Sequence, residues 1–278
     1  MSAKNQTFKI ARVGLHRFEE PCISGDGGSG TIFFGGCNMR CLFCQNYEIS
    51  HTGKGVEITL DELIKCMEYL VEKGAENINL VTPPADINLL VKALNKAKET
   101  IKVPIVWNSN GYETVANLKK LEGLVDVWLP DFKYSDETLA VNYSGAPKYF
   151  EVATEAIKEM RRQQPIDVFD DEGMLLKGVI VRHLVLPRGL KNTQGVLNRI
   201  AEIDKSMYVS LMGQYFPTPA VATHSVLSRR LNQSEYDSAI ECFYKAGLTN
   251  GFSQDLDSAI EDYVPSFDLE ELCEVLGR

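Results

Sequence analysis

Three cysteines with the spacing C-x3-C-x2-C lie within eight positions of one another, at Cys37, Cys41 and Cys44. They follow Gly35-Gly36 and the strand-like run Thr31-Ile32-Phe33-Phe34. Thiolate is the usual protein ligand of the irons in a 4Fe–4S cluster. Three neighbouring cysteines can bind three of the four irons and leave the fourth iron open to a substrate or cofactor. The sequence therefore predicts a 4Fe–4S cluster held by these three residues.

A zinc site is the alternative interpretation of the same loop. Structural zinc usually takes four ligands, and His51 is the candidate for the fourth. Zinc knuckles favour paired C-x2-C units, whereas this loop contains one such unit, Cys41 and Cys44. Three further cysteines, Cys66, Cys242 and Cys273, lie in helix-like patterns, where we expect them to pack as small buried hydrophobic residues.

The cysteine motif, with the aromatic Phe43 before its last cysteine, resembles the signature of the radical S-adenosylmethionine superfamily. The likeness extends to much of the chain and is strongest for the branch similar to pyruvate formate-lyase activating enzymes. The stretches that carry it are 15–25, 30–46, 77–83, 131–133, 182–187, 212–215 and 250–252.

This resemblance implies a defined reaction. The amino and carboxylate groups of S-adenosylmethionine chelate the open iron, and the reduced cluster passes an electron to the sulfonium. The S–C5′ bond breaks and gives methionine and a 5′-deoxyadenosyl radical, which abstracts hydrogen from the substrate. The resemblance further implies an electron donor such as flavodoxin or ferredoxin, and no catalytic residue beyond the cluster and the cofactor.

Three functions remain open. The first is an activase that installs a glycyl radical on a partner protein. The second is a radical reaction on a small molecule or peptide. The third is an iron–sulfur or zinc protein without enzymatic activity. The release of 5′-deoxyadenosine under a reductant separates the third from the first two.

The elements that must position the cysteine loop alternate between short strands and amphipathic helices. Thr59 to Glu62 fits a capping box that begins a helix. Residues 166–169 and 174–186 flank a turn and predict a hairpin. The other expected strands are 31–34, 77–81, 104–107, 125–129 and 207–211, and the other expected helices are 86–100, 113–121, 135–164, 193–203, 234–246 and 268–276.

Alternating strands and helices imply parallel strands joined by right-handed crossovers. About six such units are present, fewer than the eight of a closed barrel. We therefore predict an α/β fold, a partial (β/α)6 TIM-like barrel with a radical S-adenosylmethionine core. We expect one domain over residues 1–278, with an N-terminal extension at 1–28 and a C-terminal tail at 248–278 whose apolar residues dock on the barrel.

Candidate cofactor contacts follow the predicted strands, where the carboxyl ends of parallel strands meet. Thr82 follows the second strand, at the place where relatives often carry a Gly-Gly-Glu-like stretch that binds the cofactor's amino group. Asn108-Ser109-Asn110-Gly111 resembles the Asp-Thr-Asn-Gly of activating enzymes, so we expect Asn108 and Ser109 to contact the cofactor. A turn before a helix accounts for Asn110-Gly111 equally well. The resemblance also places Phe43 at the cofactor.

Charged and polar residues complete the predicted cofactor site. Asp131 and Lys133 alternate along one side of an extended segment, and we expect them to bind the cofactor's polar groups; a surface ion pair is the alternative. Arg182 lies in an apolar strand, where an unpaired charge is costly, so we expect it to face an anion inside the barrel. Gln214 and Tyr215 follow the last strand. We interpret His183 and His224 as structural.

Composition limits the partners. The chain has 278 residues, is 44% hydrophobic and carries a net charge of -9 at pH 7. A negative surface repels phosphate backbones, so we expect no nucleic-acid partner. The sequence has no apolar run of membrane-spanning length and no signal peptide at its N-terminus. We therefore expect a cytoplasmic, monomeric protein without a membrane partner, whose substrate is a protein, a peptide or a small molecule.

Overall fold

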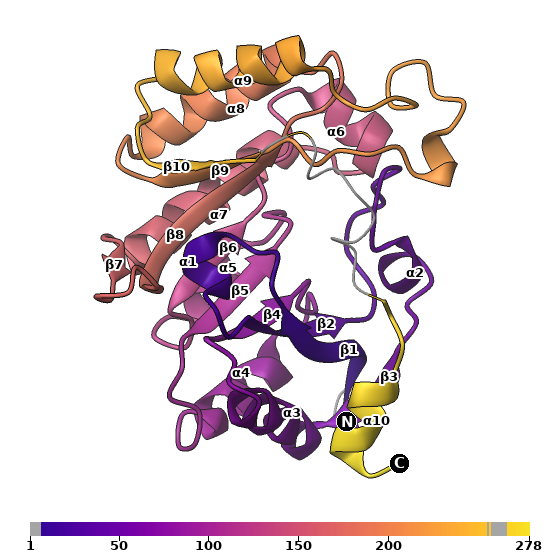
Figure 1. Ribbon diagram of the computed structural model, residues 1–278, viewed down its shortest axis with the longest axis vertical. Coiled ribbons are helices and arrows are strands. Elements are labelled where there is room, and N and C mark those ends of the chain that lie inside the picture. The colour runs from indigo at the N-terminus through magenta and orange to yellow at the C-terminus, as the bar shows by residue number, and fades with distance from the viewer. Residues whose placement is uncertain (1–6, 255, 257–265) are drawn as a thin grey trace.

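The computed structural model describes residues 7–254, 256 and 266–278. Within them, a strongly twisted sheet forms the centre of the molecule (Figure 1). Its strands are β1 (Thr7–His16), β2 (Ser29–Phe34), β3 (Val56–Thr59), β4 (Ile78–Val81), β5 (Ile105–Ser109), β6 (Val127–Pro130), β7 (Val168–Phe169), β8 (Leu175–Leu184), β9 (Tyr208–Met212) and β10 (Gly251–Ser253). Along the sheet their order is β10-β9-β8-β6-β5-β4-β2-β1-β3, and β7 pairs with β8 outside this path.

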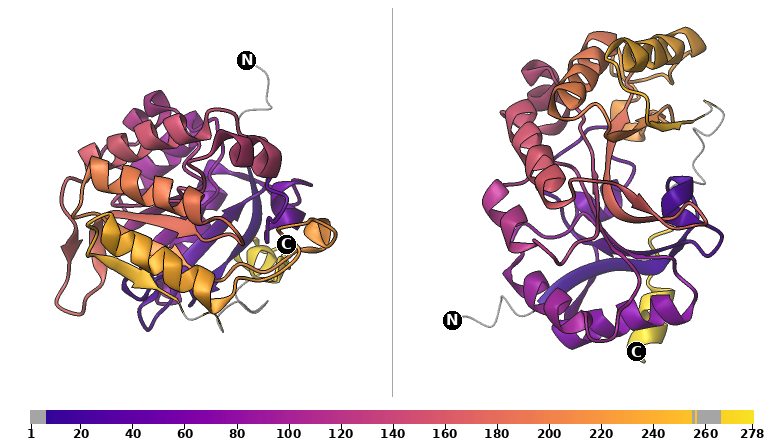
Figure 2. Two further views of the ribbon diagram at one scale, coloured as in Figure 1. Left: turned by 90° about the horizontal axis from the view of Figure 1, so that it is seen from above. Right: turned by 90° about the vertical axis from the view of Figure 1, so that its left-hand side faces the viewer.

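The longer helices lie on the outer, convex side of this sheet in the three views (Figures 1 and 2). The helices are α1 (Pro21–Ser24), α2 (Tyr47–Ser50), α3 (Leu60–Glu72), α4 (Asn88–Ala97), α5 (Val115–Lys120), α6 (Glu137–Ser144), α7 (Tyr149–Gln163), α8 (Leu190–Ile203), α9 (Gln233–Lys245) and α10 (Glu270–Leu276), with a 3-10 turn, η2 (Pro219–Val221). Among the described residues, no helix is long and apolar enough to cross a bilayer.

The parallel part of the sheet confirms the predicted fold. β2, β4, β5, β6, β8 and β9 pair in parallel in this succession, with helices in the connections between them. This is a partial (β/α)6 barrel, to which the short β10 adds one more parallel strand beside β9. The predicted capping box is also present: the Thr59 side chain accepts from the Glu62 amide, and the Glu62 carboxylate accepts from the Thr59 amide.

The predicted N-terminal extension contains a strand of the sheet. β1 pairs antiparallel with β2 on one side and with β3 on the other. Neither β1 nor β3 was expected from the sequence, because Lys9 and Arg12 interrupt the apolar pattern of β1 and β3 is only four residues long. The predicted hairpin is confirmed as the antiparallel pair of β7 and β8.

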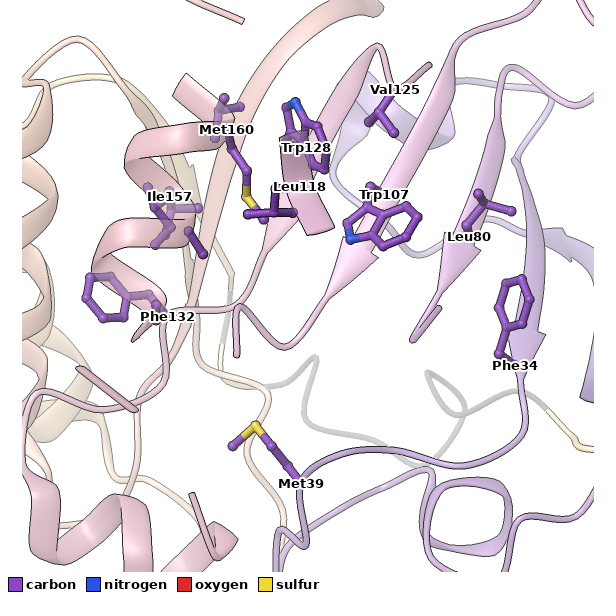
Figure 3. Close-up of a cluster of buried hydrophobic side chains, with 14 of the residues drawn as sticks. Phe34, Met39, Leu80, Trp107, Leu118, Val125, Trp128, Phe132, Ile157 and Met160 are labelled. Atoms are coloured by element: carbon purple, nitrogen blue, oxygen red, sulfur yellow. The ribbon is translucent and has the colours of Figure 1, made fainter. Parts of the chain in front are cut away.

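The main core lies between the strands and the outer helices (Figure 3). Phe34, Leu80, Trp107 and Trp128 project from four neighbouring strands and belong to one buried cluster with residues of the outer helices, including Leu118, Ile157 and Met160. Every one of these side chains is at most 2% exposed. Burial on this scale, at roughly 25 cal/mol per Å² of apolar surface, holds the helices on the sheet.

The inner face of the barrel has its own small core. Cys22 and Ile23 of α1 pack against side chains from the first halves of the parallel strands, including Val106, Val127 and Ile180. Because side chains alternate along a strand, Val106 points inward while its neighbour Trp107 points outward. The segment around α1 therefore closes the amino-terminal end of the barrel and leaves the carboxyl end for a site.

Candidate functional site

The cysteine loop begins where β2 ends and is fixed by backbone contacts at both ends. Gly35 donates to the Lys9 carbonyl at 2.8 Å, and a Cβ atom at Gly35 would lie 2.7 Å from the Lys54 carbonyl oxygen. Further along, the amides of Arg40 and Leu42 donate to carbonyls at the end of α6, at 2.9 Å and 2.8 Å. The close approach at Gly35 explains why glycine precedes the cysteines.

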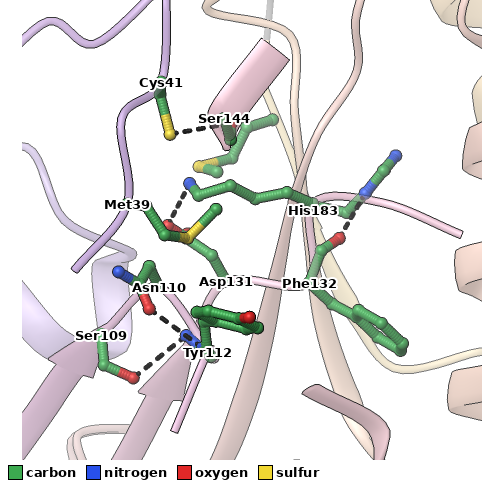
Figure 4. Close-up of polar contacts among 12 residues, drawn as sticks. Met39, Cys41, Ser109, Asn110, Tyr112, Asp131, Phe132, Ser144 and His183 are labelled. Atoms are coloured by element: carbon green, nitrogen blue, oxygen red, sulfur yellow. Dashed lines mark hydrogen bonds and ion pairs between the residues drawn. The ribbon is translucent and has the colours of Figure 1, made fainter. Parts of the chain in front are cut away.

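The three thiols line one cavity of about 240 Å³ at the carboxyl ends of the strands. Figure 4 shows Cys41 beside Ser144 and above Asp131. Each sulfur has a polar neighbour on a different element: Ser144 Oγ donates to Cys41 Sγ at 3.0 Å, Asn110 Nδ2 donates to Cys37 Sγ at 3.4 Å, and Ser50 Oγ lies 3.1 Å from Cys44 Sγ. Donors of this kind stabilise a sulfur that carries negative charge.

The donor set fits a 4Fe–4S cluster. Burial raises the pKa of Cys41 to about 11 and also raises the pKa of Cys44, so metal binding must displace their protons. Within the described ranges, no three His, Cys, Asp or Glu side chains converge closely enough to hold a single metal ion. A 4Fe–4S cluster does not require three ligands to converge on one atom, because each thiolate binds a different iron. His51, the candidate fourth zinc ligand, packs its ring against Tyr47 and is not among the residues that line this cavity.

Eight of the nine predicted cofactor contacts line the same cavity as the thiols. They lie in the cysteine loop and at the carboxyl ends of five neighbouring parallel strands, which explains how distant sequence positions meet. These residues are Phe43, Thr82, Asn108, Ser109, Asp131, Lys133, Arg182 and Gln214.

Tyr215 is the exception, and its prediction is wrong. The residue is 1% exposed, and its hydroxyl donates to the Leu227 carbonyl at 2.6 Å. Its ring meets the ring of Phe43 edge to face, with centroids 5.8 Å apart. Because Gln214 points into the cavity, the next residue of the extended chain points away from it. Tyr215 therefore supports Phe43 from behind.

Asp131 and Lys133 form an ion pair inside the cavity, with Nζ and Oδ2 2.5 Å apart. Their side chains are 22% and 18% exposed, so the alternative of a surface ion pair is wrong. Burial lowers the pKa of Lys133, but the Asp131 carboxylate and the Cys41 sulfur outweigh it and raise the pKa above its ordinary value. Lys133 is therefore a charged donor beside Cys41, one of the predicted cluster ligands.

Arg182 does meet an anion inside the barrel, and that anion belongs to the protein. Its guanidinium donates to both oxygens of Glu20, at 2.9 Å and 2.5 Å, and to the carboxylate of Glu19. Asn79 also donates to Glu19, at 3.3 Å. Arg182 lines the cavity with its charge already neutralised, which the sequence did not reveal because the two glutamates lie over 160 positions away.

The residues at the end of β5 and directly after it bind the Glu113 carboxylate and form a turn. Ser109 donates to the Glu113 carboxylate at 2.6 Å, and Trp107 Nε1 donates to the same carboxylate at 2.9 Å. Burial raises the pKa of Glu113. Asn110 accepts from the Tyr112 amide at 2.9 Å while its Nδ2 reaches Cys37. Asn110 therefore belongs to the predicted turn and also lines the cavity.

The two ends of the chain supply residues that sequence reasoning did not place at the site. His16 and Glu19, from the end of β1 and the loop after it, line the cavity. In the described part of the C-terminal tail, Phe267 packs edge to face on Phe33, with centroids 5.6 Å apart, and belongs to one cluster with Val81. Phe33 and Val81 line the cavity, so the tail docks behind its wall; Tyr263 and Val264 lie outside the described residues.

The family model described as the radical SAM superfamily matches residues 31–185, which is more than half of the chain. The chain belongs to the radical SAM superfamily. Members of this superfamily use a 4Fe–4S cluster and S-adenosylmethionine, so the two predicted cofactors are confirmed at the level of the family. The assignment of particular residues to them stays a prediction.

Comparison with individual proteins places this radical SAM chain among diverse relatives. It is 31% identical to an uncharacterized protein of Methanocaldococcus jannaschii over 235 residues, which cover 79% of this chain and 63% of that protein. It is 40% identical to the pyruvate formate-lyase 1-activating enzyme of Escherichia coli over 52 residues, 18% of this chain and 21% of that enzyme. The chain thus spans less than two thirds of either relative.

A solved structure supports the fold alone. Methylornithine synthase superposes with a TM-score of 0.54 at 14% sequence identity, over 89% of this chain and 81% of that enzyme. At this level of identity the two proteins share the fold alone, and the comparison carries no statement about substrate.

Proposed function

We propose that this radical SAM protein is an oxidoreductase whose cluster is held by Cys37, Cys41 and Cys44 and whose S-adenosylmethionine lies in the cavity beside them. The observation that carries the proposal is the convergence of the three thiols with polar residues from five strand ends on one cavity. When bound, the cluster and S-adenosylmethionine supply a 5′-deoxyadenosyl radical that abstracts hydrogen from a substrate.

The chain's own residues bind and orient the cofactor and keep water out. Lys133 is a charged N–H donor suited to a carboxylate, and Asp131 holds it in place and can accept from an ammonium or a hydroxyl. Asn108 and Gln214 offer neutral amides at the same cavity. Phe43, supported by Tyr215, provides an apolar surface that excludes water from the reacting bond.

For the substrate, we propose a glycyl site of a partner protein, which the chain would convert to a glycyl radical. The local identity of 40% with a pyruvate formate-lyase activating enzyme supports this activase function. The same proposal includes two further points. A donor protein supplies the electron, and the protein acts in the cytoplasm. The seven cysteines are free of disulfides, as is usual in a reducing compartment.

A radical reaction on a small molecule or peptide is the second candidate, and a side cavity favours it. This cavity has a volume of about 520 Å³ and shares five lining residues with the cofactor cavity: His16, Glu19, Arg182, Met212 and Gln214. A small substrate there would lie beside the cofactor. Two amides, Gln214 and Gln254, hydrogen-bond to each other across its wall at 3.2 Å.

Replacement of one cysteine tests the cluster. In Cys41→Ala, we expect the anaerobically reconstituted protein to lose most of its iron and all release of 5′-deoxyadenosine, because the cluster loses one of three thiolates. Cys66→Ala is the matched control, since Cys66 is buried in α3 away from the cavity. A full 4Fe–4S spectrum in Cys41→Ala would contradict the assignment.

A second experiment separates the two substrate classes. The wild-type protein is incubated anaerobically with reductant, S-adenosylmethionine and a glycyl-radical enzyme, and electron paramagnetic resonance is used to detect a protein-centred radical. We expect a radical on the partner and one 5′-deoxyadenosine per radical formed. Release of 5′-deoxyadenosine without any partner radical would favour the small-molecule candidate.

A further inference from the structure

A groove on the outer surface lies directly behind Cys44. It has a volume of about 510 Å³ and is lined by Cys44, Gln45, Tyr47 and the segment 216–220. Cys44 and Gln45 also line the cofactor cavity. These two residues therefore form the wall between the cofactor cavity and the exterior, and a molecule in this Cys44 groove would be one side chain away from the predicted cluster.

The surface around the Cys44 groove is apolar and aromatic. Tyr47 is 52% exposed, and Leu42, next to Cys41, is 37% exposed. The ring of Tyr47 packs against His51, with centroids 4.5 Å apart. Thr218 donates to the Leu42 carbonyl at 3.2 Å and so ties the cysteine loop to the far side of the groove. Exposed aromatic and apolar side chains on a braced surface are the usual composition of the centre of a protein interface.

Arg40 carries a positive charge within electrostatic reach of His51, whose ring packs on the groove residue Tyr47. Arg40 is exposed within the cysteine loop, and its guanidinium donates to the carbonyls of Cys37 and Met39. Carbonyl oxygens do not neutralise a guanidinium, so its charge remains available to an acidic partner. Charges near the rim of an interface mainly raise the rate of encounter and make it dependent on salt.

We propose that the Cys44 groove is the docking surface of a small electron-carrier protein with a low-potential flavin or iron–sulfur group. One electron leaves the reduced carrier and enters the cluster, and no bond in either protein forms or breaks. The inference rests on the proposed function, because cleavage of the cofactor consumes one external electron each time. The groove brings the exterior to the predicted cluster ligand Cys44 at an apolar, ring-rich surface, which suits a protein partner better than a small ion.

The test compares two reductants on the same protein. Release of 5′-deoxyadenosine by the reconstituted full chain is measured with sodium dithionite and, separately, with limiting reduced flavodoxin. For Tyr47→Ala and Leu42→Ser, we expect the flavodoxin-driven rate to fall about tenfold, within the range measured for contributing residues of an interface. The dithionite-driven rate should stay within about twofold of wild type, because a small reductant needs no docking surface.

Control variants keep the result specific. Tyr244→Ala removes a tyrosine that is 66% exposed on α9, away from the groove, and should change neither rate. Arg40→Gln should weaken the salt dependence of the flavodoxin-driven rate. Iron content is measured for each variant, and Leu42→Ser decides the test if Tyr47→Ala binds less iron.

Two outcomes would overturn the inference. An unchanged flavodoxin-driven rate in both groove variants would place the donor elsewhere. Loss of radical transfer to a substrate protein, with flavodoxin-driven cleavage intact, would make the groove a substrate surface. Absence of 5′-deoxyadenosine from the wild type with dithionite is a different result, because it contradicts the proposed function itself.

Discussion

Two charged groups lie on the inner face of the barrel, and their environments differ. At one, Lys133 has a single carboxylate partner, Asp131, and both side chains keep about a fifth of their surface exposed in the cofactor cavity. At the other, Arg182 is held by two carboxylates, Glu19 and Glu20, with exposed fractions of 11%, 9% and 6%. The first group has hydrogen-bonding capacity left for a ligand, whereas the second is neutralised within the protein.

The difference separates a binding group from a structural one. A guanidinium that bridges two carboxylates joins β8 to the loop before α1, and α1 carries the residues that close the amino-terminal end of the barrel. An ammonium with one partner can give its remaining N–H groups to a ligand carboxylate. Four substitutions test this distinction.

Arg182→Met should cause the largest change, a loss of about 3–5 kcal/mol in the free energy of unfolding, because two buried carboxylates lose their counter-charge. Urea denaturation measures it. Lys158→Met is the control: the Lys158 side chain is 50% exposed and pairs with Glu155, which is 60% exposed, and such surface ion pairs contribute less than about 1 kcal/mol. Equal stability of the two variants would remove the structural role of Arg182.

His183 connects the two groups and should make stability depend on pH. It follows Arg182 in β8, and its Nδ1 bonds to the carbonyl of Phe132, between Asp131 and Lys133, at 2.7 Å (Figure 4). Burial lowers its pKa from 6.5 to about 4. The folded state therefore favours the neutral ring. The resulting contribution to the free energy of unfolding is fully present above pH about 6.5 and is lost as the pH falls toward about 4. The total loss amounts to up to about 3 kcal/mol. In His183→Gln, the free energy of unfolding should depend less steeply on pH across this range. An equally steep pH dependence in this variant would assign the effect to other groups.

Lys133→Met should weaken binding of S-adenosylmethionine with little loss of iron. A charge-assisted hydrogen bond contributes about 1.5–3 kcal/mol, so the dissociation constant should rise roughly ten- to hundredfold. Calorimetry on the reconstituted protein measures it. Lys96→Met is the matched control, because Lys96 pairs with Asp61 on the exposed surface. Unchanged affinity in Lys133→Met would make Lys133 structural like Arg182.

Tyr215→Phe should produce the smallest effect. It removes the hydrogen bond to Leu227 and should cost about 1 kcal/mol of stability while S-adenosylmethionine affinity stays the same. Phe43→Ala is the informative partner variant, because Phe43 lines the cavity and should weaken the affinity. A large loss of affinity in Tyr215→Phe would return Tyr215 to the cofactor site.

The sequence by itself determined those features of this protein that depend on residues a few positions apart. The apolar periodicity of the helices, the capping box at Thr59 and the alternation of strands and helices were sufficient to predict the partial barrel, because each depends on neighbours a few positions apart. The cysteine motif was sufficient to predict the radical SAM superfamily and its two cofactors, while the role of each cysteine stays a prediction. Strand ends were sufficient to bring most of the predicted cofactor contacts to one cavity, since parallel strands bring their carboxyl ends to one edge.

The tertiary structure alone decided which charges remain for a ligand. Arg182 and Lys133 look alike in sequence, as cations next to apolar strands, yet only one has two distant carboxylates as partners. The same holds for Tyr215, whose direction depends on the register of a single residue, and for β1, which is stabilised by pairing with one strand on each side. Pairing between distant segments is governed by packing and burial, which no short sequence pattern records.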